Sequence, residues 1–313
     1  MTGAKPQPQR ILVIKLGALG DVIQALGPMA AIRRHHTDAE IVCLTTAPFA
    51  ELIERSGLVD RIEIDSRPST FDIAGWLALR RKLRSGGYAR AYDLQTSGRS
   101  SRYYKLFWPG PYPEWSGIAA GCSHPHVNPK RDFMHTIDRQ AEQLRMAGIA
   151  DVPLPNLDHV DADISRFNLP QSYPVIVPGG AAHRPEKRWP MENWRALAEN
   201  LTAKGRAVII LGGADERPLA AEIADGLSDV LDLTGATSLV EMIAVLRRAD
   251  LAVGNDTGPM HAAAVLGIPA TVLYSHASDP ALCAQRGPNV TILRRPALSD
   301  LGADEVIQAI LAG

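Results

Sequence analysis

The residues best suited to bind a ligand in this 313-residue chain lie in residues 251–261, which end in Gly-Asn-Asp-Thr-Gly-Pro-Met-His. An apolar run, then small residues, then proline predicts a strand, a tight turn and a helix that starts at once. The first N–H groups and the dipole of such a helix attract an anion, so Thr257 and Gly258 lie where a phosphate would be held. Asp256 would repel a phosphate and suits sugar hydroxyls instead. The structural alternative is that Asp256 or Thr257 only caps the helix, but the concentration of Asn, Asp, Thr and His261 favours binding.

Two other turns follow predicted strands in the same half of the chain. Residues 178–190 carry two glycines and then three cations, which would neutralise a diphosphate. Among these cations Lys187, next to Trp189 and a predicted helix, should be the most firmly held. Residues 211–216 end in carboxylates, among them Glu216. These would accept hydrogen bonds from a ribose, or only complement the dipole of the next helix.

A fourth glycine turn, at residues 15–21, joins the first predicted strand to the first predicted helix. Its two glycines, Gly17 and Gly20, are a weak signal, and Asp21 is also a good helix N-cap by residue type. The turn lacks the G-x-G-x-x-G pattern, and the second predicted strand ends in Cys-Leu-Thr-Thr without an acidic residue. Both absences weigh against a dinucleotide-binding dehydrogenase.

Predicted strands and helices alternate through both halves of the chain, which indicates an α/β fold with parallel sheets covered on both faces. The predicted strands are residues 11–14, 40–44, 61–64, 88–94, 175–177, 207–211, 230–233, 251–253 and 270–273. A helix should start near Asp21, and others should lie at 73–84, 190–204, 216–227, 238–248, 258–266 and 303–311. Ligands bind at the carboxyl ends of parallel strands, so the four turns are expected to line binding sites.

The chain is longer than a single hydrophobic core usually allows. Residues 149–174 contain four prolines and little periodicity, which is typical of a linker. We therefore expect two doubly wound domains, residues 1–160 and 161–313, with the proline-rich segment as a hinge. The last helix is expected to pack back on the first domain.

Composition excludes several classes of protein. With 46% hydrophobic residues, 21% charged residues and a net charge of −1, the chain fits a globular protein without a nucleic-acid footprint. The three cysteines lie far apart and the histidines lack a ligand spacing, so neither a disulfide scaffold nor a metal or cofactor is expected. The D-x-D at 161–163 lies in the linker and is interpreted as solvated loop. A polar start and the lack of an apolar run of about 20 residues predict a cytoplasmic protein that meets lipids only at a membrane surface.

Charge is distributed unevenly along the chain. Residues 1–150 carry 20 Lys and Arg against 14 Asp and Glu, whereas residues 151–313 carry 13 against 20. The basic half suggests an anionic partner, although solvated faces also produce such asymmetry. Residues 80–82 are interpreted as a solvated helix face or a weak membrane contact. The cations near predicted strand ends or loops are Lys15, Arg99, Arg102, Lys105 and Arg139.

Three blocks together resemble the ADP-heptose:lipopolysaccharide heptosyltransferases, glycosyltransferase family 9. They are the Gly-x-x-Gly-Asp of residues 17–21, the Pro-Gly-Gly and Lys-Arg-Trp-Pro of residues 178–190, and residues 254–261. The resemblance covers nearly the whole chain and implies a GT-B fold, in which two Rossmann-like domains face a cleft. It implies inverting, metal-independent transfer of heptose from ADP-heptose to a lipopolysaccharide inner-core acceptor, at the inner face of the inner membrane. Residues 135–139 also resemble the family's connection between domains.

Carried over residue by residue, the resemblance implies a division of roles. Asp21 would be the catalytic base that removes a proton from the acceptor hydroxyl. Asp256 would contact the hydroxyls of the heptose. Lys187, Thr257 and Gly258 would contact the phosphates of the donor.

The resemblance also implies the outer parts of the two sites. Glu216 would meet the ribose, Thr237 would lie near the adenosine, and His261 and His183 would belong to the donor site. Ala182 and His183 stand where some relatives have Thr or Ser, which removes one hydroxyl contact to the donor. The expected acceptor contacts are Lys15, Gly20, Arg99 and Arg139.

Two alternatives to this function stay open on the sequence. One is a different nucleotide-sugar enzyme on the same fold, such as another transferase or an epimerase, and the other is a non-catalytic nucleotide-binding module. Acceptor-dependent release of ADP would separate a transferase from a binding module. Product analysis would separate heptose transfer from other sugar-nucleotide chemistry.

Overall fold

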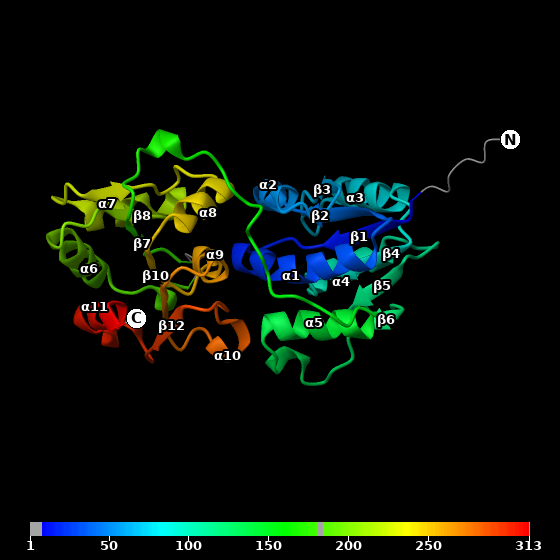
Figure 1. Cartoon of the computed structure of the whole chain (residues 1–313). Coiled ribbons are helices and arrows are strands. Elements are labelled where there is room, and N and C mark those ends of the chain that lie inside the picture. Colours follow the sequence, from blue (N-terminus) through cyan, green and yellow to red (C-terminus); the bar gives the residue numbers. More distant parts are fainter. Residues whose placement is uncertain (1–7, 181–183, 313) are drawn as a thin grey trace. The chain divides into compact units, whose positions relative to one another are not determined.

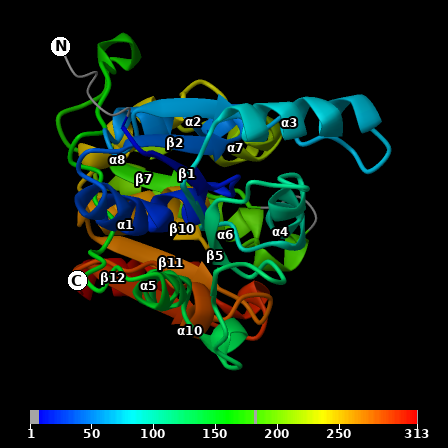
Figure 2. The same cartoon turned by 90° about the vertical axis from the view of Figure 1, so that its right-hand side faces the viewer.

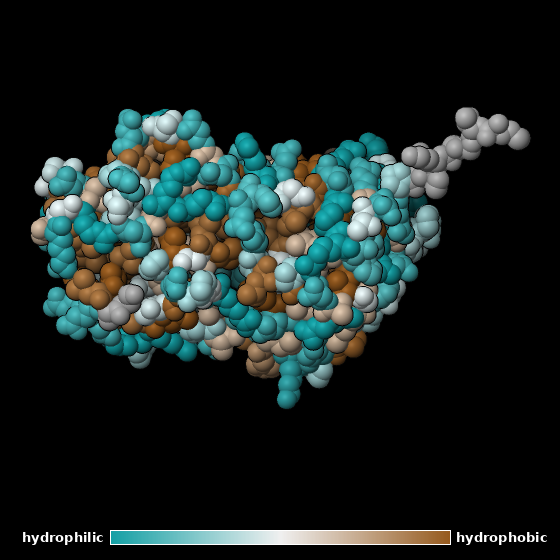
Figure 3. Space-filling view, in the orientation of Figure 1, coloured by the Kyte–Doolittle hydropathy of each residue, from teal (hydrophilic) through white to brown (hydrophobic). Residues whose placement is uncertain are grey.

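The computed structural model describes residues 8–180 and 184–312, and the chain divides between Pro155 and Asn156 into two compact units. Helices flank one parallel sheet in each unit (Figure 1). The division falls inside the proline-rich segment 149–174. Hydrophilic residues are spread over the visible surface of each unit, with hydrophobic residues between them (Figure 3).

The first unit contains a six-stranded sheet whose strands all run parallel. The strands are β1 (Arg10–Ile14), β2 (Glu40–Thr45), β3 (Arg61–Ile64), β4 (Arg90–Asp93), β5 (Glu114–Gly117) and β6 (His124–Pro125), in the order β3-β2-β1-β4-β5-β6. The helices are α1 (Leu19–His35), α2 (Ala47–Arg55), α3 (Ile73–Ser85), α4 (Gly98–Lys105) and α5 (Thr136–Met146). The four apolar residues of β1 are wholly buried, as expected of a central strand covered on both faces.

The second unit repeats the architecture with another six-stranded parallel sheet. Its strands are β7 (Pro174–Val177), β8 (Val208–Ile210), β9 (Val230–Asp232), β10 (Leu251–Asn255), β11 (Ala270–Tyr274) and β12 (Val290–Arg294), in the order β12-β11-β10-β7-β8-β9. Its helices are α6 (Met191–Ala203), α7 (Arg217–Ala224), α8 (Leu239–Arg247), α9 (Gly258–Leu266), α10 (Pro280–Cys283) and α11 (Ala303–Ala312). The last helix, α11, packs against α6 and β11 of this unit.

Two tryptophans fix the start of α6 in the core of the second unit. The rings of Trp189 and Trp194 meet edge to face with centroids 4.8 Å apart, an arrangement that aromatic pairs favour. Trp189 Nε1 donates to the carbonyl oxygen of Leu301 at 2.7 Å. The chain is therefore anchored two residues after Lys187.

The predicted α/β class with two parallel sheets is confirmed, and every predicted strand and helix is present. Helix α9 has the predicted bounds, and α1 begins at Leu19, two residues before the predicted start near Asp21. Several elements were not predicted: the strands β5, β6 and β12 and the helices α2, α4, α5 and α10.

Residues 135–139 lie at the start of α5, inside the first unit and before the division at Pro155, so the prediction that they connect the domains is wrong. Within the described ranges, no helix is both long enough and apolar enough to cross a membrane.

Candidate functional site

The turn after β10 is shaped by close packing between the strand and α9. A Cβ atom on Gly254 would lie 2.6 Å from Met260 Sδ and 3.0 Å from Val177 Cβ, so no larger residue fits there without displacing these neighbours. Asn255, which follows, is wholly buried. The glycine allows α9 to begin directly above its own strand.

Asn255 ties this turn to the loop after β7. Its Nδ2 donates to the carbonyl oxygens of Pro178 and Gly179 at 2.8 and 2.9 Å, and its Oδ1 accepts from the backbone N–H of Trp189 at 3.2 Å. All the polar capacity of the buried amide is used in this way except one lone pair. Asn255 therefore holds together the carboxyl ends of two neighbouring strands.

Asp256 is the centre of a hydrogen-bond cluster at this turn. Its Oδ2 accepts from Lys187 Nζ at 2.8 Å and from Ser278 Oγ at 2.7 Å. Its Oδ1 accepts from the Tyr274 hydroxyl and from Gln285 Nε2, both at 3.0 Å. Burial alone would raise the pKa of Asp256, but the hydrogen bonds from Lys187 and Ser278 outweigh it, and the pKa is lowered. The group is a carboxylate that keeps a lysine in place.

Thr257 occupies the N-cap position of α9 without capping the helix through its side chain. Its hydroxyl donates instead to the carbonyl oxygen of Asn255 at 3.1 Å. Since the Asp256 oxygens are also engaged elsewhere, the structural alternative that one of these two residues caps the helix is wrong. The first N–H groups of α9, at Gly258, therefore remain able to bind an anion. His261, one turn further along, is buried.

Glu216 fastens two glycine turns of the same sheet edge. Its Oε1 accepts from the N–H of Gly180 after β7, and its Oε2 accepts from the N–H of Gly213 after β8, each at 2.8 Å. A Cβ atom on Gly179 would lie 1.6 Å from Glu216 Oε1, so the carboxylate needs a glycine there. Each oxygen uses one of its two acceptor sites on the protein, which leaves acceptor capacity for a ligand.

The cations of the β7 loop differ in their surroundings, and Arg184 is the exposed one. Lys187 ends a short 3₁₀ helix, and its side chain is 15% exposed in the pair with Asp256. Arg188 Nη2 donates to the carbonyl oxygen of Gly180 at 2.6 Å and so stabilises the loop itself. Thr237 is half-buried two residues before α8, and Ser238 and Glu241 form a capping box at the start of that helix. The predicted site residue His183 lies outside the described residues, as does Ala182.

These residues meet because β11, β10, β7, β8 and β9 are consecutive neighbours in one sheet. The turns after parallel strands share an edge, and this edge collects a carboxylate, a lysine and a helix start. Sequence reasoning missed Tyr274, Ser278 and Gln285, the other partners of Asp256. The only signal for them was that Tyr274 directly follows the strand predicted at residues 270–273 of the same sheet.

In the first unit, Asp21 stands one turn into the first helix. It is the third residue of α1, and its Oδ2 accepts from the backbone N–H of Ala18 at 3.2 Å, so Asp21 is not the N-cap residue considered from the sequence. Its side chain is 44% exposed, and its Oδ1 lies 4.0 Å from Lys15 Nζ. Gly20 is buried beside it in the same turn. The carboxylate is thus held at one oxygen and open to a ligand.

Lys15 reaches Asp21 from the buried end of β1. It is 2% exposed, and its Nζ donates to the carbonyl oxygen of Leu94 at 3.3 Å. Burial lowers the pKa of Lys15, although the charges of Asp21 and Asp93 oppose this shift. Burial raises the pKa of Asp93 to about 6, against hydrogen bonds from the N–H groups of Thr96 and Gln95. Sequence reasoning missed Asp93, although it lies within the strand predicted at residues 88–94.

The two arginines predicted as acceptor contacts differ in their surroundings. Both terminal nitrogens of Arg99 donate to the carbonyl oxygen of Pro68 at 3.2 Å, and the guanidinium lies 5.6 Å over the ring of Trp76. Arg139 is half-buried in the first turn of α5, where burial lowers its pKa and the charge of Asp21 opposes the shift. The charges of Arg139 and Asp21 therefore interact.

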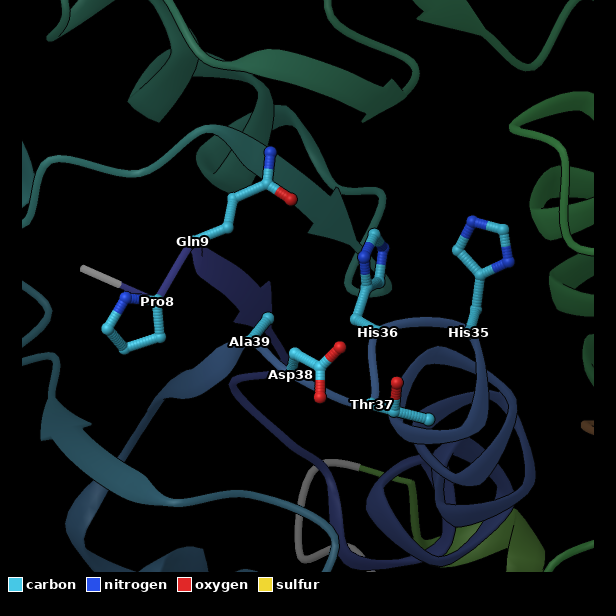
Figure 4. A pocket seen from close by; sticks show the side chains of 7 residues that line it. All are labelled: Pro8, Gln9, His35, His36, Thr37, Asp38 and Ala39. Atoms are coloured by element: carbon cyan, nitrogen blue, oxygen red, sulfur yellow. The ribbon is translucent and has the colours of Figure 1, made fainter. Parts of the chain in front are cut away.

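A separate pocket of about 430 Å³ lies at the opposite, amino end of β1 and β2. Figure 4 shows His35, His36 and Asp38 among its lining residues. His36 Nε2 lies 2.8 Å from the Tyr92 hydroxyl, and burial lowers the pKa of His36 to about 4, with the charges of His35 and Arg90 adding to this. Within the part of the chain that the structure describes, no three His, Cys, Asp or Glu side chains gather to hold a metal. The pocket is thus remote from the strand ends that carry the polar clusters.

Comparison with known proteins places these clusters in a family context. Residues 76–305 match the family model described as glycosyltransferase family 9 (heptosyltransferase). The chain is 32% identical over 297 residues to lipopolysaccharide heptosyltransferase 2 of Salmonella typhimurium, covering 86% of this chain and 83% of that protein.

Two solved structures share the fold over nearly the whole chain. A glycosyl transferase family 9 protein from Veillonella parvula has a TM-score of 0.84 at 20% identity and covers 97% of this chain and 98% of its own. ADP-heptose lipopolysaccharide heptosyltransferase II of E. coli has a TM-score of 0.78 at 21% identity, with 97% and 99% covered. At these identities the structures establish the fold, which is that of the GT-B heptosyltransferases.

Proposed function

This chain belongs to glycosyltransferase family 9, the heptosyltransferases of lipopolysaccharide biosynthesis, and is therefore a glycosyltransferase, and we propose that it inverts the anomeric centre and needs no metal. The proposed donor is ADP-heptose, and the proposed acceptor is an anionic, lipid-linked sugar of the lipopolysaccharide inner core. The reaction would take place at the inner face of the inner membrane, in peripheral contact with it.

The pair formed by Lys187 and Asp256 beside the uncapped start of α9 is the observation that carries the donor proposal. A departing nucleoside diphosphate carries negative charge, which a lysine and helix N–H groups can stabilise in place of a metal ion. Lys187, Thr257 and Gly258 are the proposed phosphate contacts. Each lies at the carboxyl end of a strand in the second sheet, where ligands of such sheets bind.

Asp256 is proposed to act on the donor both directly and through Lys187. Its oxygens already accept four hydrogen bonds, so a heptose hydroxyl would replace a donor such as Ser278 or Gln285. His261, and His183 before Lys187, complete the proposed donor site. Binding of the sugar would thereby change the hydrogen bonds of Asp256.

The nucleoside is proposed to lie along the neighbouring strand ends. Glu216 keeps acceptor capacity on both oxygens after binding Gly180 and Gly213, which suits the two hydroxyls of a ribose. Thr237 follows β9, the next strand of the sheet, where the adenine would lie. In this arrangement the phosphates, the ribose and the adenine each lie at a different turn of the sheet edge.

The proposed chemistry is one displacement. The acceptor hydroxyl oxygen bonds to the anomeric carbon as the bond from that carbon to the ADP oxygen breaks, and the hydroxyl proton passes to Asp21. Asp21 suits this role because its carboxylate is half-exposed while one oxygen is fixed by Ala18. Lys15, Gly20, Arg99 and Arg139 are the proposed acceptor-side residues, and the partly buried Arg139 would meet an acidic group of the acceptor.

A binding screen followed by a turnover assay tests this function. ADP-heptose should bind more tightly than UDP- and GDP-sugars, and ADP should be released only when a lipopolysaccharide inner-core acceptor is added. Release of ADP without acceptor, or tight binding of a UDP-sugar, would favour another nucleotide-sugar enzyme. Binding of ADP-heptose with no release under any acceptor would favour a binding module.

A further inference from the structure

Helix α3 presents an apolar face that the first unit leaves uncovered. Its buried residues are Leu79 and Leu83, whereas Ile73 and Leu77 are 72% and 55% exposed. Phe71, in the loop that leads into the helix, is 92% exposed. Figure 2 shows α3 reaching beyond the other elements of this unit. Three large apolar side chains therefore lie in solvent near the start of one helix.

The spacing of these side chains places them on one side of α3. Residues that recur every four positions form a row along a helix, and Ile73, Leu77 and Arg81 belong to one such row. All three are exposed, as are Ala74 and Ala78 in the adjacent row. The exposed face is therefore apolar in its first two turns and basic afterwards.

An exposed aromatic residue joins the basic half of the helix. Arg80 Nη2 donates to the carbonyl oxygen of Trp108 at 2.7 Å, and Arg84 Nη1 donates to the same oxygen at 3.0 Å. The side chain of Trp108 is 68% exposed. The two arginines thus hold the backbone of Trp108 beside the cations of α3, and Trp is a residue typical of membrane interfaces.

This region carries an excess of positive charge. Residues 66–85 contain five Lys and Arg side chains and one acid, Asp72. The Asp72 carboxylate is engaged as the N-cap of α3, where it accepts from the N–H of Gly75 at 2.8 Å. Lys82 pairs with Glu63 at 3.3 Å. The arginines of α3 therefore outnumber the acids that face them.

We propose that Phe71, Ile73, Leu77, Arg81 and Trp108 form a docking surface for a bilayer of anionic phospholipid, called here the α3 surface. The apolar and aromatic side chains would enter the boundary between headgroups and acyl chains, where Trp is enriched, and the arginines would meet lipid phosphates. Side chains that project from a convex helix suit a fluid bilayer, which closes around them. A protein partner would need a matching hollow for each of them.

The α3 surface adds to the proposed function, because a lipid-linked acceptor lies at a bilayer. Its biological use rests on the proposed function, whereas its binding to lipid does not. The test uses the full chain and vesicles of phosphatidylcholine, with or without a third of phosphatidylglycerol, and needs neither donor nor acceptor. The protein should sediment with the anionic vesicles and not with the neutral ones. A failure of heptose transfer would leave this result standing, and the reverse also holds.

Substitutions at exposed positions assign the binding to the α3 surface. Phe71→Ser with Ile73→Ser should weaken vesicle binding about tenfold, because two inserted apolar side chains are lost. Arg81→Glu should weaken it at least about fivefold, since one cation near an anionic surface contributes that much. The matched controls are Phe133→Ser, at an aromatic residue 81% exposed elsewhere in the unit, and Arg145→Glu, on the exposed side of α5; both should bind as the unmodified chain does.

Three results would overturn the proposal. They are absence of binding to anionic vesicles, equal binding by the Phe71/Ile73 variant, and equal weakening by the two control variants. A chain that ignores vesicles but self-associates less after the Phe71/Ile73 change would show that α3 meets protein instead. Circular dichroism of each variant checks that the chain is folded. Only variants with the spectrum of the unmodified chain are compared in vesicle binding.

Discussion

Lys187 Nζ lies 2.8 Å from Asp256 Oδ2, and this pair joins the turn after β7 to the turn after β10. The lysine side chain is 15% exposed and the aspartate side chain 8%, so the pair is largely shielded from water yet reaches the surface at the lysine. Three neutral donors also hold the aspartate: Ser278 shares Oδ2 with the lysine, and Tyr274 and Gln285 donate to Oδ1. A cation fixed in this way is ready for a diphosphate without any side chain having to reorganise.

Lys187→Met should weaken ADP binding about tenfold to hundredfold, because a hydrogen bond to a charged group contributes about 1.5–3 kcal/mol. Asp256→Asn should weaken it about tenfold, since the amide keeps the shape of the cluster but no longer orients the lysine by charge. The double variant should be no worse than Lys187→Met alone, because Asp256 acts on ADP through the lysine. Isothermal titration calorimetry with ADP measures all three, and additive losses would contradict the coupling.

Two glycines that flank Glu216 offer a sharper test of the ribose position. A Cβ at Gly179 would lie 1.6 Å from Glu216 Oε1, whereas a Cβ at Gly213 would meet no atom within 4 Å. Gly179→Ala should therefore displace the carboxylate and lower ADP affinity at least as much as Glu216→Gln does. Gly213→Ala is the matched control and should bind ADP normally. Normal binding by Gly179→Ala would show that the carboxylate is not needed where it stands.

Much of the second-unit site could be predicted because it is local in sequence. Residues 254–258 combine strand, turn and helix signals within one block, and the following helix has the bounds that its Pro and its apolar spacing predict. Lys187 could be ranked above its neighbouring cations because Trp189 anchors the chain beside it. In each case the deciding neighbours are a few residues away.

Contacts between distant strands could not be predicted in the same way. Nothing near Tyr274 or Gln285 in sequence indicates that both meet Asp256, because their approach depends on the order of strands in the sheet. The start of α1 was misplaced because Ala18 stands at the N-cap and gives no polar signal, which left Asp21 as the apparent cap. The short strands β5 and β6 are polar and lack the apolar run that marks the central strands.

Asp93 should make the first unit less stable as the pH rises from about 4 to about 6. Burial raises the pKa of Asp93 from 3.8 to about 6, so the folded unit holds this proton more tightly than the unfolded chain does. Its contribution is complete below the unfolded pKa and is lost as the pH passes through the folded pKa, a change of about 3 kcal/mol. Hydrogen exchange at the amides of β1 and β4 reports on this unit alone.

The matched variant for this prediction is Asp93→Asn, which keeps an oxygen to accept from the N–H groups of Gln95 and Thr96. It removes the titration, so protection of β1 and β4 should no longer fall between these two pH values. Protection should also exceed that of the unmodified chain at neutral pH. An unchanged pH dependence would mean that another group titrates in this range.

Asp21→Asn should lower kcat by about a hundredfold to ten-thousandfold, the range that a general base supplies. ADP affinity should not change, because every proposed donor contact comes from the second unit. The asparagine oxygen can still accept from the N–H of Ala18, so the start of α1 should remain intact. Glu241→Gln is a control, because Glu241 is also the third residue of its helix and accepts from the backbone N–H of the N-cap residue Ser238. Glu241 also pairs with Arg166, a contact that bears on the stability of the second unit and not on the proposed chemistry. If capping were the only role of these two acids, both variants would lose a little stability and keep their turnover. The proposed base therefore predicts a difference between them in kcat, measured as acceptor-dependent ADP release. Turnover by Asp21→Asn within about twofold of the unmodified chain would remove Asp21 from the chemistry and leave it as a residue that holds the first turn of α1.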